Sequence, residues 1–528
     1  MGTYVNPGNA GFSRIVRSNY VDKTGLISLM NDRLGGNKSL VCISRPRRFG
    51  KSYTAEMLTA YYDCSCDSHE LFDDKVIAGI DSYRKHLNKY NVICLDITGF
   101  ISEAKRKLES LRLVPERIVN AILQELPVEG KSDVINDSLL KFVEETGRGI
   151  VFVIDEWDAM IREAKDDPVA QEAYLNLLRG WFKNSNFTPK AVSAAYMTGI
   201  LPIKKDGSQS AISNFLEYSV IKPRIFAPYV GFTEEEVSVL CEKNNISFDK
   251  MKQWYDGYSF KGVESVYNPN SVMQAIENND FDSYWAESAT SRELLEYIGK
   301  DYNGLSKTIA ELIGGVEVKV DTTGFANDLT TFRSKNDVLT LLIHLGYLAY
   351  DADKGTVHIP NEEIKQEFQK SIHEVKHEAT IKRLEESEKL FVDTIQKHEE
   401  SVAAQIEKVH LEETVAIHYN KEESLRSVIK LAYYSYRDHY VQFEELPAGE
   451  GYADVVYLPK SDSDWPALVI ELKWNKDAES GIDQILKKKN PSVLENLERP
   501  VLLVAITYDK NAKAGEKKHS CKIMEYKI

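Results

Sequence analysis

The chain has 528 residues, of which 43% are hydrophobic and 28% are charged. Domains commonly contain about 100–200 residues, so this length predicts two or three compact units. The apolar fraction excludes a globally disordered chain. The net charge of −15 argues against a protein that coats nucleic acid through overall basic charge. The acidic excess lies upstream, because residues 421–528 carry 17 basic and 18 acidic side chains.

The sequence has the pattern of an intracellular protein without a membrane segment. Residues 1–26 lack the apolar core of a signal peptide. No uninterrupted apolar run approaches the ~18 residues that a membrane-spanning helix needs. The six cysteines are sparse, which is typical of reduced thiols. We therefore expect a cytoplasmic protein with no membrane partner.

Apolar runs of strand length alternate with helical segments over residues 1–228. Continuous apolar runs are typical of strands that are buried on both faces, and their alternation with helices predicts a mostly parallel sheet. The fold class expected here is therefore α/β. The expected strands are 40–43, 90–97, 149–154 and 192–197, and the expected helical regions are 103–126, 132–145 and 168–182.

A phosphate-binding loop is predicted directly after the first strand, in RPRRFGKS (Arg45–Ser52). Gly50 would let backbone amides turn inward, Lys51 would neutralise the β- and γ-phosphates, and Ser52 would ligate Mg²⁺. A helix beginning at Lys51 would point its positive dipole end at the phosphates. Arg45 stands where the usual pattern has its first glycine. The loop residues expected to contact the nucleotide also include Arg48, Phe49 and Tyr53.

Two acids end the apolar strand IVFVIDE and predict the second half of a nucleotide site. Asp155 would hold Mg²⁺ and Glu156 would polarise the attacking water. Thr198, at the end of the next strand, lies where such enzymes often keep a polar residue that senses the γ-phosphate. The alternative is a basic turn followed by acids that cap a helix. The three features in this order favour an ATP site with Mg²⁺.

The rest of the chain divides into three further predicted parts. Residues 229–360 lose the strand rhythm and predict a helical lid domain. Residues 361–420 are densely charged and predict a helical connector. Residues 421–528 contain a helix and three short strands, with another helix between the last two strands. The predicted domains are therefore 1–228, 229–360, 361–420 and 421–528.

Three charged residues in the last part form a candidate metal-dependent nuclease site. Glu471 and Lys473 share one face of the strand ALVIELKW, and a hairpin would bring Asp454 beside them. Two close carboxylates suit Mg²⁺ or Mn²⁺, which would activate water, while Lys473 would add positive charge. Glu422 and Gln484 are further candidates from neighbouring helices. The alternative is a solvated ion pair between Glu471 and Lys473.

Motifs along nearly the whole chain carry a family resemblance. The N-terminal ones include YVDKTGLI, RPRRFGKS, VIDEWD and MTGI, the middle ones GFTEEEV, WYDGYSF, YNPNSV and IPNEEI, and the C-terminal ones LAYYSYRDHY, ELPAGEGYADVVY and IELKWNK. With these motifs the chain resembles a bacterial family that joins an AAA-ATPase-like domain to a C-terminal PD-(D/E)xK nuclease-superfamily domain. The resemblance implies that arginine at the position of Arg45 is a trait of the family.

The resemblance implies a specific architecture and set of site residues. The implied fold is a P-loop ATPase core of the ASCE/AAA-like class, with a helical lid, a charged connector and a restriction-endonuclease-like α/β domain. The implied ATP site comprises Gly50, Lys51, Ser52, Asp155 and Glu156, and the implied nuclease site comprises Asp454, Glu471 and Lys473, with Glu422 and Gln484 in support. This chain departs from the family pattern at Ala453, Asn490 and around Glu422, which leaves the substrate contacts and the identity of the upstream acid open.

Two classes of function follow from these patterns. The first is an ATP-regulated, metal-dependent nuclease, with DNA favoured over RNA as its nucleic-acid partner. The second is a nucleotide-dependent switch or assembly protein, whose C-terminal domain binds nucleic acid or protein without cutting. A homo-oligomer is compatible with either class.

Overall fold

The computed structural model describes two compact units. One comprises Met1–Tyr297 with Lys319–Glu367, and the other comprises Ile298–Val318 with Phe368–Ile528. The residues described are 2–203, 212–260, 262–285, 305–325, 332, 334–375, 378–413, 425, 428–429, 432–433, 440–448, 451–459, 465–475, 477–487, 500–512 and 517–526. Helices expected to form a separate connector over 361–420 fall mostly within the second unit.

The first unit is built on a five-stranded sheet whose described pairings are all parallel, with the order β2-β3-β4-β1-β5. This confirms the predicted parallel α/β arrangement. The strands are β1 (Leu40–Ser44), β2 (Asn91–Asp96), β3 (Ile150–Asp155), β4 (Val192–Gly199) and β5 (Leu216–Tyr218). Strand β5 was not expected, because it is only three residues long and two of them are partly exposed. Strand β4 lies between β1 and β3, so the ends of all three are adjacent.

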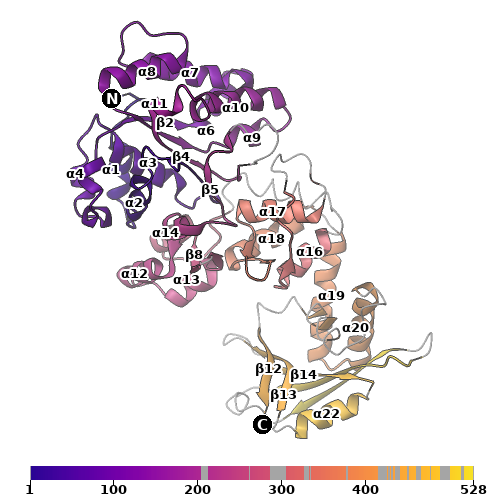
Figure 1. The fold of residues 1–528 in the computed structure, drawn as a ribbon. Coiled ribbons are helices and arrows are strands. Elements are labelled where there is room, and N and C mark those ends of the chain that lie inside the picture. The colour runs from indigo at the N-terminus through magenta and orange to yellow at the C-terminus, as the bar shows by residue number, and fades with distance from the viewer. Residues whose placement is uncertain are drawn as a thin grey trace. The chain divides into compact units, whose positions relative to one another are not determined.

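Helices cover both faces of this sheet (Figure 1). On one face, Phe152 of β3 packs with Trp181 and Phe182 of α10 (Pro168–Phe182). The same core also contains residues of α6 (Ile97–Arg106), α7 (Val114–Glu125) and α8 (Ile135–Thr146). Successive strand residues point to opposite faces, so Val151 and Val153 face the other side, where α3 contacts β2, β3 and β4. Burial on both faces explains the continuous apolar runs in the sequence.

Helices form in all three expected regions, although the first of them begins at Ile97, before the predicted start at residue 103. The predicted region 103–126 is divided, because α6 and α7 are separated by a short 3₁₀ turn. The bounds are α1 (Ala10–Val16), α2 (Gly25–Asn31), α3 (Lys51–Tyr62), α4 (His69–Phe72), α5 (Tyr83–His86), α6 (Ile97–Arg106), α7 (Val114–Glu125), α8 (Ile135–Thr146), α9 (Ala159–Glu163), α10 (Pro168–Phe182) and α11 (Thr188–Ala191), with 3₁₀ turns η1 (Val76–Gly79), η2 (Leu111–Leu113) and η4 (Arg224–Tyr229).

The lid region contains short strands as well as the predicted helices. Its first part has a buried core around Tyr255 and Tyr267. The elements are β6 (Phe232–Thr233), α12 (Glu234–Asn244), α13 (Phe248–Tyr255), β7 (Tyr258–Phe260), β8 (Val263–Tyr267), α14 (Pro269–Asn278), β9 (Val318–Lys319), α17 (Lys335–Leu345), β10 (Ala349–Asp351), β11 (Thr356–His358) and α18 (Glu362–Val375). Most of these strands have only two or three residues, too few to show a period in the sequence, which explains why a predominantly helical lid was expected.

The second unit contains a five-stranded mixed sheet of order β12-β13-β14-β15-β16, in which only β14 and β15 pair in parallel. Helices α19 and α20 contribute to the core on one face, and α22 contacts β14, β15 and β16. The bounds are α16 (Leu305–Ile313), α19 (Glu378–Ile395), α20 (Glu399–Glu413), β12 (Tyr440–Ala448), β13 (Gly451–Pro459), β14 (Ala467–Trp474), α22 (Ala478–Lys487), β15 (Val501–Tyr508) and β16 (His519–Tyr526).

The expectation of three strands in this unit was wrong, because β12 and β16 form the two edges of the sheet. Edge strands have one free side and tolerate polar residues and proline, so they lack a continuous apolar run. None of the helices among the described residues is long and apolar enough to cross a membrane.

Gly257→Ala should destabilise the first unit. Gly257 has φ +117°, and a Cβ there would lie 1.9 Å from the carbonyl oxygen of Pro360. We expect a loss of more than about 2 kcal/mol in the free energy of unfolding, because both backbone strain and a clash with main chain are introduced. Gly262→Ala is the matched control, since Gly262 also has positive φ but faces open space. Equal effects on thermal unfolding would contradict the contact with Pro360.

Candidate functional site

The phosphate loop connects the end of β1 to the first turn of α3. Arg48 and Gly50 have positive φ values of +66° and +84°, and α3 begins at Lys51. The loop borders a cavity of about 440 Å³. The first helical turn directs backbone amides and the positive end of the helix dipole towards the loop, which is the arrangement that binds phosphate.

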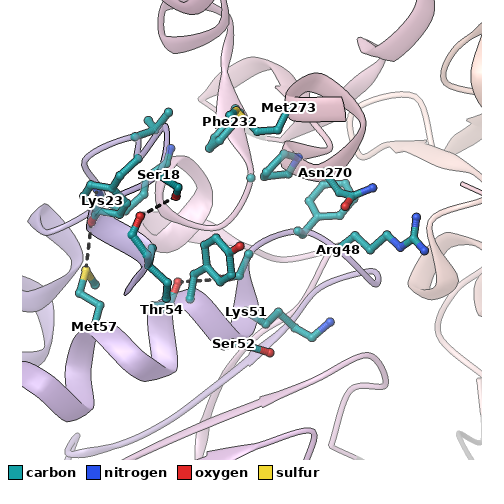
Figure 2. Close-up of a pocket in the computed structure, with 18 of the residues that line it drawn as sticks. Ser18, Lys23, Arg48, Lys51, Ser52, Thr54, Met57, Phe232, Asn270 and Met273 are labelled. Atoms are coloured by element: carbon teal, nitrogen blue, oxygen red, sulfur yellow. Dashed lines mark hydrogen bonds between the residues drawn. The ribbon is translucent and has the colours of Figure 1, made fainter. Parts of the chain in front are cut away.

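The cavity has one polar wall and one more apolar wall. Lys51 and Ser52 lie on the phosphate-loop side, whereas Phe232 and Met273 come from the lid, with Asn270 beside them (Figure 2). Other lining residues come from α1 and the segment before α2, and from α14, and include Ile15, Asn19, Tyr20, Val21, Gln274 and Glu277. A cationic side at the phosphate loop and a side with both apolar and polar groups suit a ligand that joins phosphates to a flat, hydrogen-bonding base.

Lys23 joins the N-terminal segment to the lid beside this cavity. Its Nζ donates to the carbonyl oxygen of Pro228 at 2.7 Å and to Glu236 at 2.5 Å. Glu236 also accepts the backbone N–H of Thr233 and completes the capping box that starts α12. Burial lowers the pKa of Lys23, although Glu236 acts in the opposite direction. Two of the motifs noted in the sequence, YVDKTGLI and GFTEEEV, therefore meet here.

Lys51 is buried and lies between the phosphate loop and the end of β3. Its Nζ donates to the carbonyl oxygen of Pro46 at 3.0 Å and lies 3.3 Å from Oε1 of Glu156. A buried ammonium group needs nearby negative charge. The phosphates of a nucleotide would supply such charge at the same place.

Asp155, Thr198 and Ser52 form a hydrogen-bonded group at the strand ends. The Thr198 hydroxyl donates to Asp155, because β4 lies beside β3. Burial raises the pKa of Asp155, while hydrogen bonds with Ser52 and Thr198 act to lower it. Hydroxyl and carboxylate oxygens are the ligands that Mg²⁺ prefers, so this donor set fits the ion. Ser52 borders the cavity, whereas Asp155 and Thr198 are not among its lining residues.

Glu156 is directed towards Lys51 by an unusual backbone conformation. Its φ is +51°, and its N–H donates to Asp155 Oδ1 at 3.1 Å and Thr198 Oγ1 at 3.3 Å. Positive φ costs energy for a side chain of this kind, and such strain often marks functional sites. Burial alone would raise the pKa of Glu156, but the charges of Lys51 and Arg162 outweigh it and hold the pKa below its usual value.

Arg45 does not line the cavity, and its side chain instead packs inside the first unit. Its guanidinium is fully buried and donates to the carbonyl oxygens of Ser44 and Tyr218. It also lies 4.9 Å from the ring centroid of Phe260 in the lid. Burial lowers the pKa of Arg45 to about 10. Arginine at this position therefore connects the phosphate loop with β5 and the lid.

Arg48 borders the cavity, but its guanidinium donates to the carbonyl oxygen of Tyr284. The N–H of Tyr284 in turn donates to Glu363 at 2.9 Å, and the Ser271 hydroxyl donates to the same carboxylate. Burial raises the pKa of Glu363 to about 7, and the neighbouring Glu367 acts in the same direction. The phosphate loop is thereby connected to the first turn of α18.

The other loop residues expected to bind nucleotide occupy different environments. Phe49 is buried edge-to-face against Tyr258 with ring centroids 5.3 Å apart, and Tyr53 is 58% exposed. Both border the cavity.

In the second unit, the structure brings Asp454, Glu471 and Lys473 together. Val455 pairs with Ile470 across β13 and β14, so Asp454 and Glu471 project from the same face of the sheet. Asp454 accepts the N–H of Leu472 at 2.8 Å, and Lys473 Nζ donates to Glu471 at 2.8 Å. Glu471 and Lys473 are both buried. The ion pair of the alternative interpretation is present, but it is buried rather than solvated.

Helix α22 covers the face that carries this group. Gly481 permits the approach, because a Cβ there would lie 2.7 Å from Ala505 and 3.5 Å from Lys473. Gln484 is partly exposed on the same helix. Glu422 lies outside the described residues. The two carboxylates supply hard oxygen ligands suited to Mg²⁺ or Mn²⁺, although no group of three or more metal-binding side chains is found within the described part of the chain.

Comparison with protein families bears on the N-terminal part. Residues 8–208 match the family described as "Predicted AAA-ATPase". This segment contains the phosphate loop, Asp155, Glu156 and Thr198, and it is an AAA-ATPase-like, nucleotide-binding domain. The match covers none of the C-terminal sheet, so a nuclease domain there stays a prediction.

Individual relatives are distant. The chain is 22% identical over 289 residues to an uncharacterized protein from the vnfD 5′ region of Azotobacter chroococcum mcd 1, covering 53% of this chain and 52% of that protein. The chain thus spans about half the length of this relative.

Two solved structures from Aeropyrum pernix are similar to parts of the chain. The ORC2 protein in ADPNP–ADP complexes has 13% identity and a TM-score of 0.34, covering 69% of this chain and 98% of its own. The ORC1 protein in complex with DNA has 11% identity and a TM-score of 0.28, covering 72% and 100%. At these scores neither structure supports an inference about this chain.

Several residues around the nucleotide cavity were not predicted from the sequence. Arg162 and Lys23 were not identified, although Asp158, four positions before Arg162, belongs to the motif VIDEWD. A carboxylate and an arginine at this spacing share one helix face, so the pairing of Asp158 with Arg162 could have been predicted from the sequence. Glu363 belongs to IPNEEI, but nothing in that motif shows that the carboxylate is buried.

Glu363→Gln should become more stable than the wild type as pH rises. In the folded chain the pKa of Glu363 is raised from the ordinary value of 4.5 to about 7, so its carboxyl group stays protonated to a higher pH than in the unfolded chain. This contribution to stability is fully present below about pH 4.5 and is lost as pH rises through about 7. The difference is at most about 3 kcal/mol. Thermal unfolding between about pH 5 and 8 tests this, with the partly exposed Glu362→Gln as control; parallel pH curves for wild type and Glu363→Gln would contradict it.

Proposed function

We propose that the first unit binds and hydrolyses ATP. The observation that carries this proposal is the position of Lys51, which is buried at the cavity between the Pro46 carbonyl and Glu156. A nucleotide phosphate would replace Glu156 as the main partner of Lys51. The apolar residues Phe232 and Met273 across the cavity are suited to a base.

Each residue of the site has a separate proposed role in phosphoryl transfer. Ser52 and Asp155 would hold Mg²⁺, which supplies positive charge to the phosphate oxygens. Lys51 and the backbone amides at the start of α3 would bind the phosphates and stabilise the charge that develops on them. Glu156 would orient a water molecule and accept its proton, and Thr198 would hold Asp155 in place.

A second activity is proposed for the C-terminal unit, because Asp454, Glu471 and Lys473 meet on one sheet face. The two carboxylates would hold Mg²⁺ or Mn²⁺, which would lower the pKa of a bound water. Lys473 would offset the negative charge of a phosphodiester during cleavage. The burial of Glu471 and Lys473 supports a role beyond surface solvation. DNA is the proposed substrate ahead of RNA, and Glu422 and Gln484 are proposed as supporting residues.

We propose further that ATP controls this nuclease in a cytoplasmic protein, and homo-oligomerisation is compatible with that role. The ATPase core at 1–228, lid at 229–360, connector at 361–420 and nuclease-like part at 421–528 remain the proposed functional divisions. The contact of Arg48 with Tyr284 supports a role for the lid, and Tyr284 in turn donates to Glu363 at the start of α18. A non-cutting switch or assembly protein is the alternative, in which Asp454 has no part in activity.

Lys51→Ala should weaken ATP binding. Removal of the ammonium group deletes a charge-assisted contact to phosphate, which is worth roughly 1.5–3 kcal/mol and corresponds to about a tenfold to hundredfold increase in Kd. Isothermal titration with ATP and Mg²⁺ measures the effect. Lys38→Ala, at an exposed position before β1, is the control. Unchanged affinity in Lys51→Ala would contradict the proposed site.

Asp454→Ala should abolish metal-dependent cleavage. Labelled single- and double-stranded DNA and RNA would be incubated with Mg²⁺ or Mn²⁺, with and without ATP. We expect the cleavage rate of Asp454→Ala to be at least about a hundredfold below that of the wild type, because the metal loses one of its two carboxylates. Asp483→Ala changes an exposed acid on α22 and should retain activity. No cleavage by the wild type on any substrate would favour the switch.

A further inference from the structure

Arg162 contacts Glu156 from the side away from Lys51. Its NH2 group donates to Glu156 Oε2 at 2.7 Å, whereas Lys51 lies near Oε1. Arg162 comes from α9, directly after the turn that carries Glu156. The cavity is lined by Glu156, and Arg162 is not among its lining residues. The contact that joins Arg162 to the cavity is therefore the one with Glu156.

Arg162 is itself held by a fixed carboxylate. Its Nε donates to Asp158 Oδ2 at 3.1 Å, and the side chain of Asp158 is fully buried. The same Oδ2 accepts the N–H groups of Ile200 at 3.2 Å and Leu201 at 2.9 Å, just beyond the end of β4. Two backbone donors and one guanidinium thus fix Asp158, and Asp158 fixes Arg162 relative to β4.

We propose that Arg162 is a positioning residue that holds Glu156 in place to accept a proton from the water that attacks the γ-phosphate. The inference rests on the proposed ATP hydrolysis. When phosphate takes Lys51, Oε1 of Glu156 loses its cation and faces the cavity, while Arg162 keeps hold of Oε2. One oxygen remains fixed and the other is available to accept a proton from water. The side chain of Glu156 is flexible on its own, so a fixed contact at Oε2 keeps the carboxylate in one orientation.

The charged groups around Glu156 are consistent with this role. Lys51, Arg162 and Arg47 act on it as cations, and Asp155 is the neighbouring acid. Lys51 is also required for phosphate, so it cannot keep Glu156 in place during the reaction. Among the groups that the structure shows in contact with the Glu156 carboxylate, Arg162 is the cation that a nucleotide need not displace.

The test is a double-mutant cycle on ATP turnover by the full chain. We expect Arg162→Ala to lower kcat by roughly tenfold to a hundredfold while the Kd of an ATP analogue changes less than about threefold. In a Glu156→Gln background, Arg162→Ala should have little further effect, because both substitutions remove one function. Arg162→Lys or added guanidinium ion should restore part of kcat. Arg112→Ala, which breaks an exposed ion pair with Asp167, is the control.

Each other outcome overturns the proposal in a distinct way. An equal loss from Arg162→Ala in both backgrounds would show that Arg162 acts independently of Glu156. A higher kcat would make Arg162 a restraint on Glu156, and a change in Kd alone would make it part of the binding site. No turnover by the wild type, with ATP binding intact, would overturn hydrolysis itself and with it the positioning role.

Discussion

The ion pair between the buried Lys51 and the partly exposed Glu156 is the interaction on which the nucleotide site depends. A lysine at this depth is costly unless negative charge lies close to it. The fold supplies that charge by placing β4 between β1 and β3, so that the phosphate loop, Thr198 and the Asp155–Glu156 turn meet at one edge of the sheet. The same edge binds ligands in open parallel sheets generally. The chain therefore presents a lysine whose present partner can be exchanged for phosphate.

Three basic side chains connect this edge to the lid. Arg45 contacts Phe260, Arg48 contacts Tyr284, and Lys23 contacts Glu236 at the start of α12. Two of the three belong to the phosphate loop, which explains why its sequence is rich in arginine. A ligand that moves the loop would have to change contacts in the lid as well. The position of the lid is thus expected to depend on what occupies the cavity.

Much of the first unit could be predicted from the sequence, because its strands are buried on both faces and appear as continuous apolar runs. The bounds of α10 agree with the expected helix, and Lys51, Ser52, Asp155, Glu156 and Thr198 lie in one region as their motifs predicted. Strand β5 and the short lid strands were not predicted, since a few residues show no period. The edge strands β12 and β16 were missed because polar residues interrupt them.

Contacts between residues far apart in the chain could not be predicted from the sequence either. No local pattern shows that Arg45 is buried under the lid, or that Glu363 lies in an environment that raises its pKa. The spacing of Asp158 and Arg162 indicates a shared helix face but not the contact with Glu156. In the second unit, strand alternation correctly placed Glu471 and Lys473 on one face, and the register of β13 with β14 then placed Asp454 beside them. The burial of that group could not be derived from alternation alone.

A crystal structure of the full chain with Mg²⁺ and a non-hydrolysable ATP analogue would test the central claim most directly. We expect the phosphates at the backbone amides of Gly50 to Ser52, with Lys51 Nζ transferred from Glu156 to a phosphate oxygen. Mg²⁺ would then lie near Ser52 and Asp155, and the base would contact the lid side of the cavity. An empty cavity at saturating nucleotide, or a nucleotide bound elsewhere while Lys51 stays paired with Glu156, would contradict it.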